Sequence, residues 1–220
     1  MIPRLWHPSP NFGERRDGAR PELVVLHYTA MAQCNAARDR LCDPAGEVSA
    51  HYLIAAEGTV LQLVDEGARA WHAGAGAWQG RGDVNSRSIG IELDNPGGQP
   101  FAAPQMRMLE KLLDEILGRW SLAPDAVIAH SDMAPGRKAD PGPRFDWRRL
   151  ARAGLSVWPE DHSGATAAPE AFRSAVLRFG YPDVADVALL SAFRLRFRPW
   201  AEGTLAPEDT QAAAALPFCS

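Results

Sequence analysis

The chain has 220 residues, which at about 150 residues per domain predicts one sizeable domain and a smaller appendage. Hydrophobic residues make up 46% and charged residues 23%, a composition that excludes a disordered or fibrous chain. The 27 acidic residues outnumber the 23 basic ones, and the formal net charge of −4 argues against a nucleic-acid partner, whose binding depends on neutralised phosphates.

The N-terminal residues and the cysteines favour a cytoplasmic protein. Residues 1–16 contain no cationic start followed by an apolar stretch, so no signal peptide is expected. The longest apolar runs are only a few residues, so no transmembrane segment is expected either. Cys34, Cys42 and Cys219 are odd in number and form no CxxC pair, which favours reduced thiols. A periplasmic or outer-membrane-attached location is the alternative if a leader has been removed.

Short strands are predicted in the first 130 residues. Two runs, 22–27 and 126–129, are rich in apolar residues in the manner of buried strands. Residues 52–56 and 60–64 are predicted to form a hairpin around a Glu-Gly turn. Residues 88–93 alternate, with isoleucine and leucine on one face and glycine and glutamate on the other.

One long helix is predicted over residues 104–120, where apolar side chains recur with the helical period. Strands interleaved with helices predict an α/β domain over residues 1–158, with a mixed central β-sheet flanked by helices. Residues 159–169 are small and polar, as in a linker. Residues 170–220 are predicted to form a small all-helical module, although 193–198 also alternates as a strand would.

Two of the predicted strands end in histidine, at His27 and His130. Ligands of α/β sheets bind at the carboxyl ends of strands, so the two imidazoles converge if their strands are parallel neighbours. Asp140 follows His130 by ten residues, in a loop stiffened by proline and glycine. Two histidines and a carboxylate, with a fourth position open for water, form a catalytic zinc arrangement. The simpler alternative for each histidine is a hydrogen-bonded core or rim residue.

Two further charged residues have a simple structural interpretation when each is taken alone. Glu92 lies on the strand face opposite the isoleucines, where it meets either solvent or a cleft. A solvated strand face is the usual outcome for a single glutamate. Lys138 lies in the same loop as Asp140, where a lysine is normally exposed.

Five segments, taken together, match the motifs of one enzyme family. They are 9–12, 48–54, 71–74, 88–93 and 130–143. Their residues closely resemble the type-2 N-acetylmuramoyl-L-alanine amidases, AmpD/AmiD-like zinc enzymes of the superfamily that includes phage lysozyme-type amidases and peptidoglycan-recognition proteins. The resemblance covers about residues 5–150, and the last motif, HSDMAPGRKADPGP, is long and specific.

The resemblance implies a role for each of the candidate residues. His27, His130 and Asp140 match the ligands of Zn2+, Glu92 matches the acid/base carboxylate, and Lys138 matches the lysine that stabilises the transition state. The implied reaction is hydrolysis of the amide bond between N-acetylmuramic acid, or its anhydro form, and the L-alanine of peptidoglycan stem peptides. The tail resembles the three-helix peptidoglycan-binding-like module of AmiD-like amidases, which favours a helix over 193–198.

Other residues of the motifs are candidates for substrate binding or support. Arg81 and Arg137 are candidate partners of stem-peptide carboxylates, because arginine binds carboxylates bidentately; solvated loop arginines are the alternative. Trp71 is a candidate to flank the sugar or peptide, or a core residue. His51 and His72 lie in family motifs outside the ligand set, and we predict that they are structural or support the metal ligands.

Three alternatives for function stay open at this point. An envelope enzyme acting on intact wall is favoured by the tail, whereas the missing leader favours a cytoplasmic enzyme of cell-wall recycling acting on soluble anhydro-muropeptides. A non-catalytic muropeptide-binding protein would usually lack part of the zinc set. A thiol hydrolase would use Cys34 or Cys42, but both lie in a predicted helix, 33–43, where a small buried thiol is the simpler interpretation. The sequence does not indicate an oligomeric state.

Overall fold

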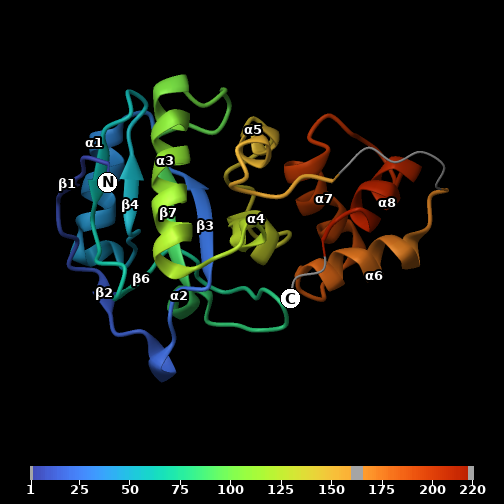
Figure 1. Cartoon of the computed structure of the whole chain (residues 1–220), viewed down its shortest axis with the longest axis horizontal. Coiled ribbons are helices and arrows are strands. Elements are labelled where there is room, and N and C mark those ends of the chain that lie inside the picture. The colour runs from blue at the N-terminus through green and yellow to red at the C-terminus, as the bar shows by residue number, and fades with distance from the viewer. Residues whose placement is uncertain (1, 160–165, 218–220) are drawn as a thin grey trace.

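The computed structural model describes residues 2–159 and 166–217, so the central part of the predicted linker, 160–165, lies outside the described residues. A mixed six-stranded sheet forms its centre (Figure 1). In spatial order the strands are β1 (Leu5–Trp6), β5 (Val60–Gln62), β4 (Tyr52–Ile54), β7 (Ser88–Leu93), β3 (Leu23–Tyr28) and β8 (Val127–Ala129). Neighbouring strands are parallel except in the β4–β5 hairpin. Two further strands, β2 (Phe12–Gly13) and β6 (Arg69–Ala70), pair antiparallel by themselves.

The helices cover both faces of the sheet, as predicted. They are α1 (Cys34–Cys42), α2 (Val84–Arg87), α3 (Ala103–Trp120), α4 (His130–Met133), α5 (Trp147–Arg152), α6 (Pro169–Phe179), α7 (Asp186–Phe197) and α8 (Pro207–Ala214). The segment 193–198 is helical up to the end of α7 at Phe197, in agreement with the family resemblance. No helix in the described ranges is long and apolar enough to cross a membrane.

The alternation of residues along each strand decides which helix it meets. Ile89 and Ile91 of β7 join the apolar stripe of α3, including Leu109 and Leu113, on the face that is in front in Figure 1. Side chains of opposite parity point to the other face, because successive residues of a strand alternate. Glu92 is among them, which places a carboxylate on the face away from α3.

The face away from α3 is covered in two separate parts. At one end α1 packs on it through Leu41, which contacts the cluster of Leu53 and Leu63. At the other end α4 and the C-terminal helices pack over Val25 and Ile128. His27 and Glu92 therefore lie between two coverings, where the sheet is open to a cleft.

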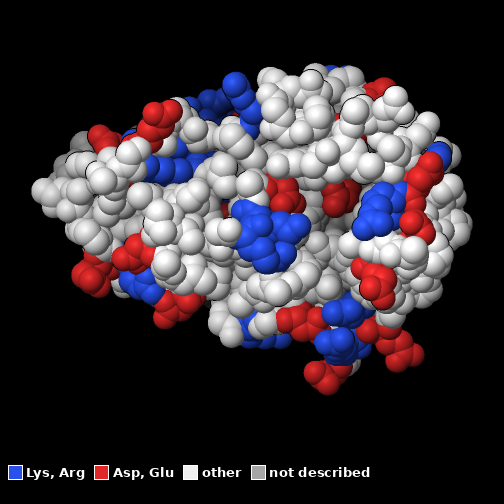
Figure 2. Space-filling view, turned by 180° about the vertical axis from the view of Figure 1, so that it is seen from behind, with Lys and Arg blue, Asp and Glu red and all other residues white. Residues whose placement is uncertain are grey.

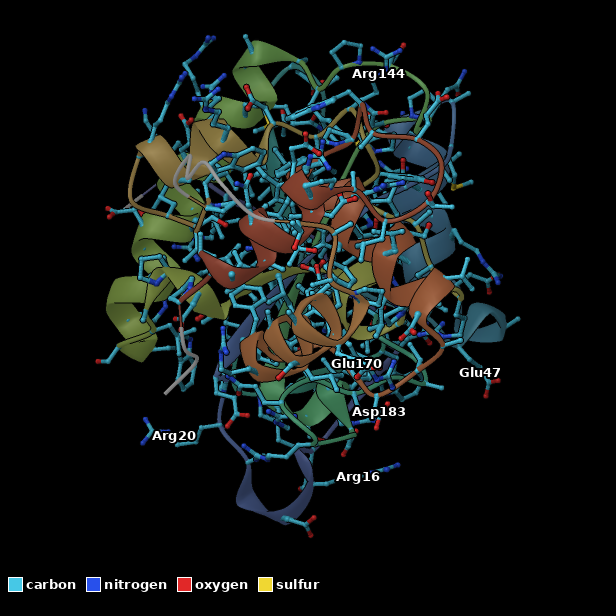
Figure 3. All side chains as sticks on the ribbon, turned by 90° about the vertical axis from the view of Figure 1, so that its right-hand side faces the viewer. Arg16, Arg20, Glu47, Arg144, Glu170 and Asp183 are labelled. Carbon is cyan, nitrogen blue, oxygen red and sulfur yellow. The ribbon has the colours of Figure 1, made fainter. Side chains whose placement is uncertain are left out.

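The C-terminal helices share one apolar core with the sheet. Phe179 of α6 and Phe193 of α7 belong to the same buried cluster as Val25, Ile128 and Met133 of the α/β part. Viewed from their side, α6, α7 and α8 lie in front of the sheet (Figure 3). Among the labelled charged side chains, Arg16, Arg20, Glu47 and Arg144 lie near the edge of this view, whereas Glu170 and Asp183 lie on the face toward the viewer. The predicted module is thus packed into the domain, not merely tethered to it.

A buried ion pair joins α7 to α4. Arg196 Nη1 donates to Asp132 Oδ2 at 2.6 Å, and both side chains have no exposed surface. The Tyr181 hydroxyl donates to Asp132 Oδ1 at 2.6 Å, and the Ala129 amide donates to Oδ2 at 2.8 Å. Asp132 lies two residues after His130, so the C-terminal helices hold the turn that carries this histidine.

Replacing Asp132 by alanine is expected to destabilise the protein strongly, because the substitution leaves the Arg196 guanidinium buried without its counter-charge. The free energy of unfolding should fall by about 3–5 kcal/mol, measured by equilibrium urea unfolding. Asp183→Ala is the matched control, because Asp183 lies in the same C-terminal part and pairs with Arg173 at the surface, with a side chain that is 76% exposed. The control should leave the free energy of unfolding nearly unchanged. Equal effects of the two substitutions would contradict a special role for the buried pair.

Candidate active site

The pairing of β3 brings the two predicted histidines to one edge of the sheet. β3 and β8 are parallel neighbours, with Leu26 opposite Ala129. His27 follows Leu26, and His130 follows Ala129 as the first residue of α4. The condition on which their predicted convergence depended is therefore confirmed.

Three ligand atoms converge at this edge. The Nδ1 atoms of His27 and His130 lie 2.9 Å apart, and each lies 2.9 Å from Asp140 Oδ2. The side chains are 2%, 4% and 13% exposed, so the cluster is nearly closed to solvent. Together they are a group that can hold a metal ion.

The hydrogen bonds of the cluster fit a metal ion. His130 Nε2 lies 2.8 Å from the carbonyl oxygen of Ala73, which can only accept, so the ring proton is on Nε2. That leaves a lone pair on His130 Nδ1, directed at the cluster. Atoms 2.9 Å apart can share one cation about 2.0–2.1 Å from each nitrogen. Two nitrogens and one carboxylate oxygen therefore form a divalent-metal site.

Burial and mutual contact set the charges of the ligands. Burial, and then the neighbouring His130, lower the pKa of His27 to about 4, so its ring is neutral near pH 7. Burial acts to raise the pKa of Asp140, but the contacts with the neighbouring His130 and His27 rings outweigh it and hold this pKa well below its usual range. Neutral imidazole and ionised carboxylate are the forms that bind metals.

Glu92 lies directly beside His27. The two residues are register partners in the parallel strands β7 and β3. Glu92 Oε2 is buried and has no hydrogen-bond partner within the part of the chain that the structure describes. Burial, and then the charge of Asp140, raise the pKa of Glu92 to about 8, while Lys138 acts to lower it. A carboxyl group with a pKa near neutrality is suited to both taking and returning a proton.

A cleft of about 380 Å3 opens over the cluster and Glu92. Among the predicted residues, Trp71, Arg137 and Lys138 line it together with the three ligands. Figure 2 views the side away from α3 and shows basic and acidic side chains gathered around a hollow near the middle of this side. The cleft thus combines a metal site, a half-buried glutamate with a buried carboxyl oxygen, and cationic walls.

The two predicted substrate-binding arginines differ in position. Arg137 Nη2 donates to the carbonyl oxygen of Ala73 at 2.8 Å, so part of its hydrogen-bonding capacity holds the loop that follows Trp71. Arg81 is not among the residues that line the cleft. It is exposed and pairs with Glu22 at 2.7 Å in a separate depression. The structure therefore does not bring Arg81 to the site, because the loop that carries it turns toward the amino end of β3.

The sequence analysis missed several residues of the cleft wall, among them Tyr28, Thr29 and Arg40. Tyr28 and Thr29 follow His27 directly, and their place after the carboxyl end of a strand was a signal that could have found them. Arg40 comes from α1 and lines the cleft from the opposite side. No local motif marks it, because only the packing of α1 on the sheet brings it there.

The remaining histidines and cysteines have definite surroundings. His51 is buried, accepts from the Gly90 amide at Nδ1 and contacts the Ala68 carbonyl through Nε2, as a structural residue does. His72 contacts His27 at 3.0 Å. Burial is the main cause that raises the pKa of Cys34 to about 11, and neither Cys34 nor Cys42 lines the cleft.

Comparison with known proteins agrees with this geometry. The sequence matches the family N-acetylmuramoyl-L-alanine amidase (Amidase_2) over residues 17–143. It is 35% identical to the N-acetylmuramoyl-L-alanine amidase AmiD of Escherichia coli (strain K12), across 89% of this chain and 81% of that protein. It is also 35% identical to the 1,6-anhydro-N-acetylmuramyl-L-alanine amidase AmpD of Enterobacter cloacae, across 65% of this chain and 86% of that protein.

A solved structure extends the similarity into the C-terminal helices. The complex of Escherichia coli AmiD with the substrate anhydro-N-acetylmuramic acid-L-Ala-D-γ-Glu-L-Lys has a TM-score of 0.79 and 33% sequence identity. The match covers 94% of this chain and 97% of the AmiD chain. The chain therefore belongs to the N-acetylmuramoyl-L-alanine amidase family, and the resemblance carried by its motifs is confirmed.

Proposed function

We propose that this protein hydrolyses the amide bond between N-acetylmuramic acid, or its anhydro form, and the L-alanine of peptidoglycan stem peptides, with Zn2+ as its resident metal. The observation that carries the proposal is the His27–His130–Asp140 cluster with Glu92 beside it in one cleft. One relative, Escherichia coli AmiD, has been solved with the substrate anhydro-N-acetylmuramic acid-L-Ala-D-γ-Glu-L-Lys.

The donor set favours zinc among the divalent metals. Zinc accepts imidazole nitrogens and carboxylate oxygens at similar distances, and catalytic zinc sites keep a further position for water or substrate. Bound zinc supplies a water of pKa about 7 and polarises the carbonyl oxygen that is attacked. The chain supplies the ligands already deprotonated, because burial keeps His27 neutral and the two histidines keep Asp140 ionised.

Glu92 moves the proton in this reaction. Its carboxylate takes a proton from the attacking water as the water oxygen bonds to the lactyl carbonyl carbon. It then delivers this proton to the alanine nitrogen as the carbon–nitrogen bond breaks, so the products are a carboxylic acid and an amine. The buried Oε2, free of protein hydrogen bonds in the described part of the chain, leaves the group available for both transfers.

Lys138 and the cleft walls act on the substrate's charges. The Lys138 side chain lines the cleft close enough to His27 and Glu92 for its charge to lower both pKa values. An ammonium group at this position stabilises the oxyanion that forms on the attacked carbonyl. Arg137, Arg40 and Trp71 line the same cleft, where they meet the peptide and the sugar.

The two alternative functions, a muropeptide-binding protein and a thiol hydrolase, fit the site less well than the amidase does. A protein that only binds muropeptides has no need of a buried carboxyl group next to a complete metal cluster. A thiol hydrolase requires an accessible thiolate, whereas burial raises the pKa values of Cys34 and Cys42.

The compartment and the size of the substrate are a further part of the proposal. We expect soluble anhydro-muropeptides in the cytoplasm, as in cell-wall recycling, with action on intact wall in the envelope as the alternative. Fractionation of cells that express the untagged, full-length protein distinguishes the two. Recovery from the periplasm or outer membrane would overturn the recycling assignment.

Removal of the metal should abolish turnover. Treatment with a chelator is expected to stop release of the stem peptide from an anhydro-muropeptide, and stoichiometric Zn2+ should restore it. The reason is that both the activation of the water and the polarisation of the attacked carbonyl depend on a Lewis acid. Mass spectrometry of the products checks both the rate and the bond that is cut. Unchanged cleavage after verified zinc loss would contradict the proposal, and binding without cleavage by the zinc-loaded protein would favour the recognition protein.

Glu92→Gln should separate proton transfer from metal binding. The variant keeps the shape of the side chain but has no acid/base group, so kcat should fall by about 10²–10⁴-fold. Zinc content, measured by atomic absorption, should stay near that of the wild type, because Glu92 is not a ligand. Glu170→Gln is the surface control, because Glu170 is exposed, and it should leave kcat unchanged. Retained activity in Glu92→Gln would contradict the assignment of Glu92 as the acid/base group.

The same variant should change the pH dependence of stability in chelator-treated protein. The pKa of Glu92 is about 8 in the folded protein and about 4.5 when exposed. Between these values the unfolded chain releases a proton that the folded protein keeps, so the free energy of unfolding falls as the pH rises. Urea unfolding at pH 5 and pH 8 should show a smaller fall for Glu92→Gln than for the wild type and for Glu170→Gln. An identical fall in all three proteins would show that the pKa of Glu92 is not raised in the folded protein.

A further inference from the structure

We propose that His72 and Ser88 are positioning residues that set the tautomer of His27, so that the Nδ1 lone pair of His27 faces the metal site. The proposal rests on the metal-binding role of His27 and is independent of which amide bond is cut. His72 and Ser88 do not contact the metal ligand atoms of the cluster. They act through the far side of the His27 ring.

Three successive hydrogen bonds lead away from the site. His27 Nε2 lies 3.0 Å from His72 Nδ1. His72 Nε2 lies 3.1 Å from Ser88 Oγ. Ser88 Oγ lies 2.6 Å from the carbonyl oxygen of Val84. The series thus runs from β3 through the loop after Trp71 to the junction of α2 and β7.

The last acceptor decides the direction of every bond in the series. A carbonyl oxygen only accepts, so the single hydroxyl proton of Ser88 is donated to Val84. Ser88 Oγ must then accept from His72, which places the His72 proton on Nε2 and leaves Nδ1 as an acceptor. His72 Nδ1 in turn accepts from His27 Nε2, and the neutral His27 ring keeps its lone pair on Nδ1.

The opposite arrangement carries a cost at each step. If His27 had its proton on Nδ1, His72 would have to donate from its own Nδ1, and its Nε2 would become an acceptor. Ser88 would then have to turn its hydroxyl toward His72 and give up the 2.6 Å bond to Val84. Because Ser88 is fully buried, the Val84 carbonyl would lose a bond that water cannot easily replace.

The tautomers of the two metal-binding histidines are set by different partners. His130 has its tautomer set directly by a backbone carbonyl, that of Ala73, at 2.8 Å. His27 has a second imidazole at the equivalent place. A histidine can donate or accept at Nδ1, so it sets the tautomer of His27 only if its own tautomer is set, which is the role of Ser88.

The surrounding backbone is built to hold His72 in this position. A Cβ atom on Gly90 would lie 2.4 Å from Cγ of the His72 ring, so only glycine leaves room for it in β7. The amides of His72 and Ala73 both donate to Asn85 Oδ1, at 3.0 and 2.8 Å. The ring is therefore fixed from the strand below it and from its own backbone.

The first test reads the tautomers without any substitution. Nitrogen-15 NMR of the metal-free wild-type protein at neutral pH is expected to show the His27 proton on Nε2 and the His72 proton on Nε2. A His27 proton on Nδ1 in this protein would overturn the proposal. The measurement uses neither substrate nor activity, so its failure is distinct from failure of the proposed function.

The second test measures zinc affinity by competition with a fluorescent chelator. His72→Phe keeps the ring shape and removes both hydrogen bonds, and should weaken zinc binding by about 10–100-fold. His72→Asn keeps an acceptor oxygen at the place of Nδ1, and should recover most of the affinity. A merely structural role predicts the reverse order, because phenylalanine fills the space of the imidazole better than asparagine does.

Ser88→Ala and Ser49→Ala form a matched pair for the far end of the series. Both serines are buried and both hydroxyls donate to a backbone carbonyl at 2.6 Å, but Ser49 contacts the Trp71 amide and not the His72 ring. Ser88→Ala should weaken zinc binding and raise the fraction of His27 protonated on Nδ1, whereas Ser49→Ala should change neither. Equal zinc affinity for wild type, Ser88→Ala and His72→Phe would overturn the proposal.

Discussion

The parallel pairing of β3 with both of its neighbours is the constraint on which the rest of the site depends. Pairing with β8 places His130 next to the end of His27's strand, and pairing with β7 places Glu92 opposite His27 itself. A shift of one residue in either register would turn these side chains to the face covered by α3. Backbone hydrogen bonds of the sheet thus position His27, Glu92 and the start of the turn that carries His130.

Burial then converts this arrangement of residues into chemistry. In water His27 would be partly protonated, which weakens it as a metal ligand, and the Glu92 carboxylate would be a weaker base for the proton of water. Burial lowers the pKa of His27 and raises that of Glu92, while Asp140 stays ionised beside the two histidine rings. The C-terminal helices contribute to this burial, since Arg196 and Tyr181 hold Asp132 in the turn that carries His130.

Much of the fold and the site was predictable from local patterns. The alternation in 88–93 put Glu92 on the face away from the helix, and the strand-end positions of His27 and His130 indicated convergence. Arg40 and Arg81 mark the limit of such reasoning. Both are arginines in polar surroundings, but α1 packs toward the cleft, whereas the loop with Arg81 turns to Glu22. Contacts between side chains on separate elements depend on how those elements pack, and the periodicity of a local sequence does not predict that packing.

The sequence by itself determined five strands of the central sheet, the main helix, the amidase family and the metal-binding set, because period, glycine and proline placement and motif spacing are local properties of the chain. Only the tertiary structure decided that the C-terminal helices share the core of the sheet and that His72 links His27 to Ser88. These relations join residues far apart in the chain. Their physical basis is burial, which forces distant polar groups to find partners and so fixes a proton on one nitrogen and not the other.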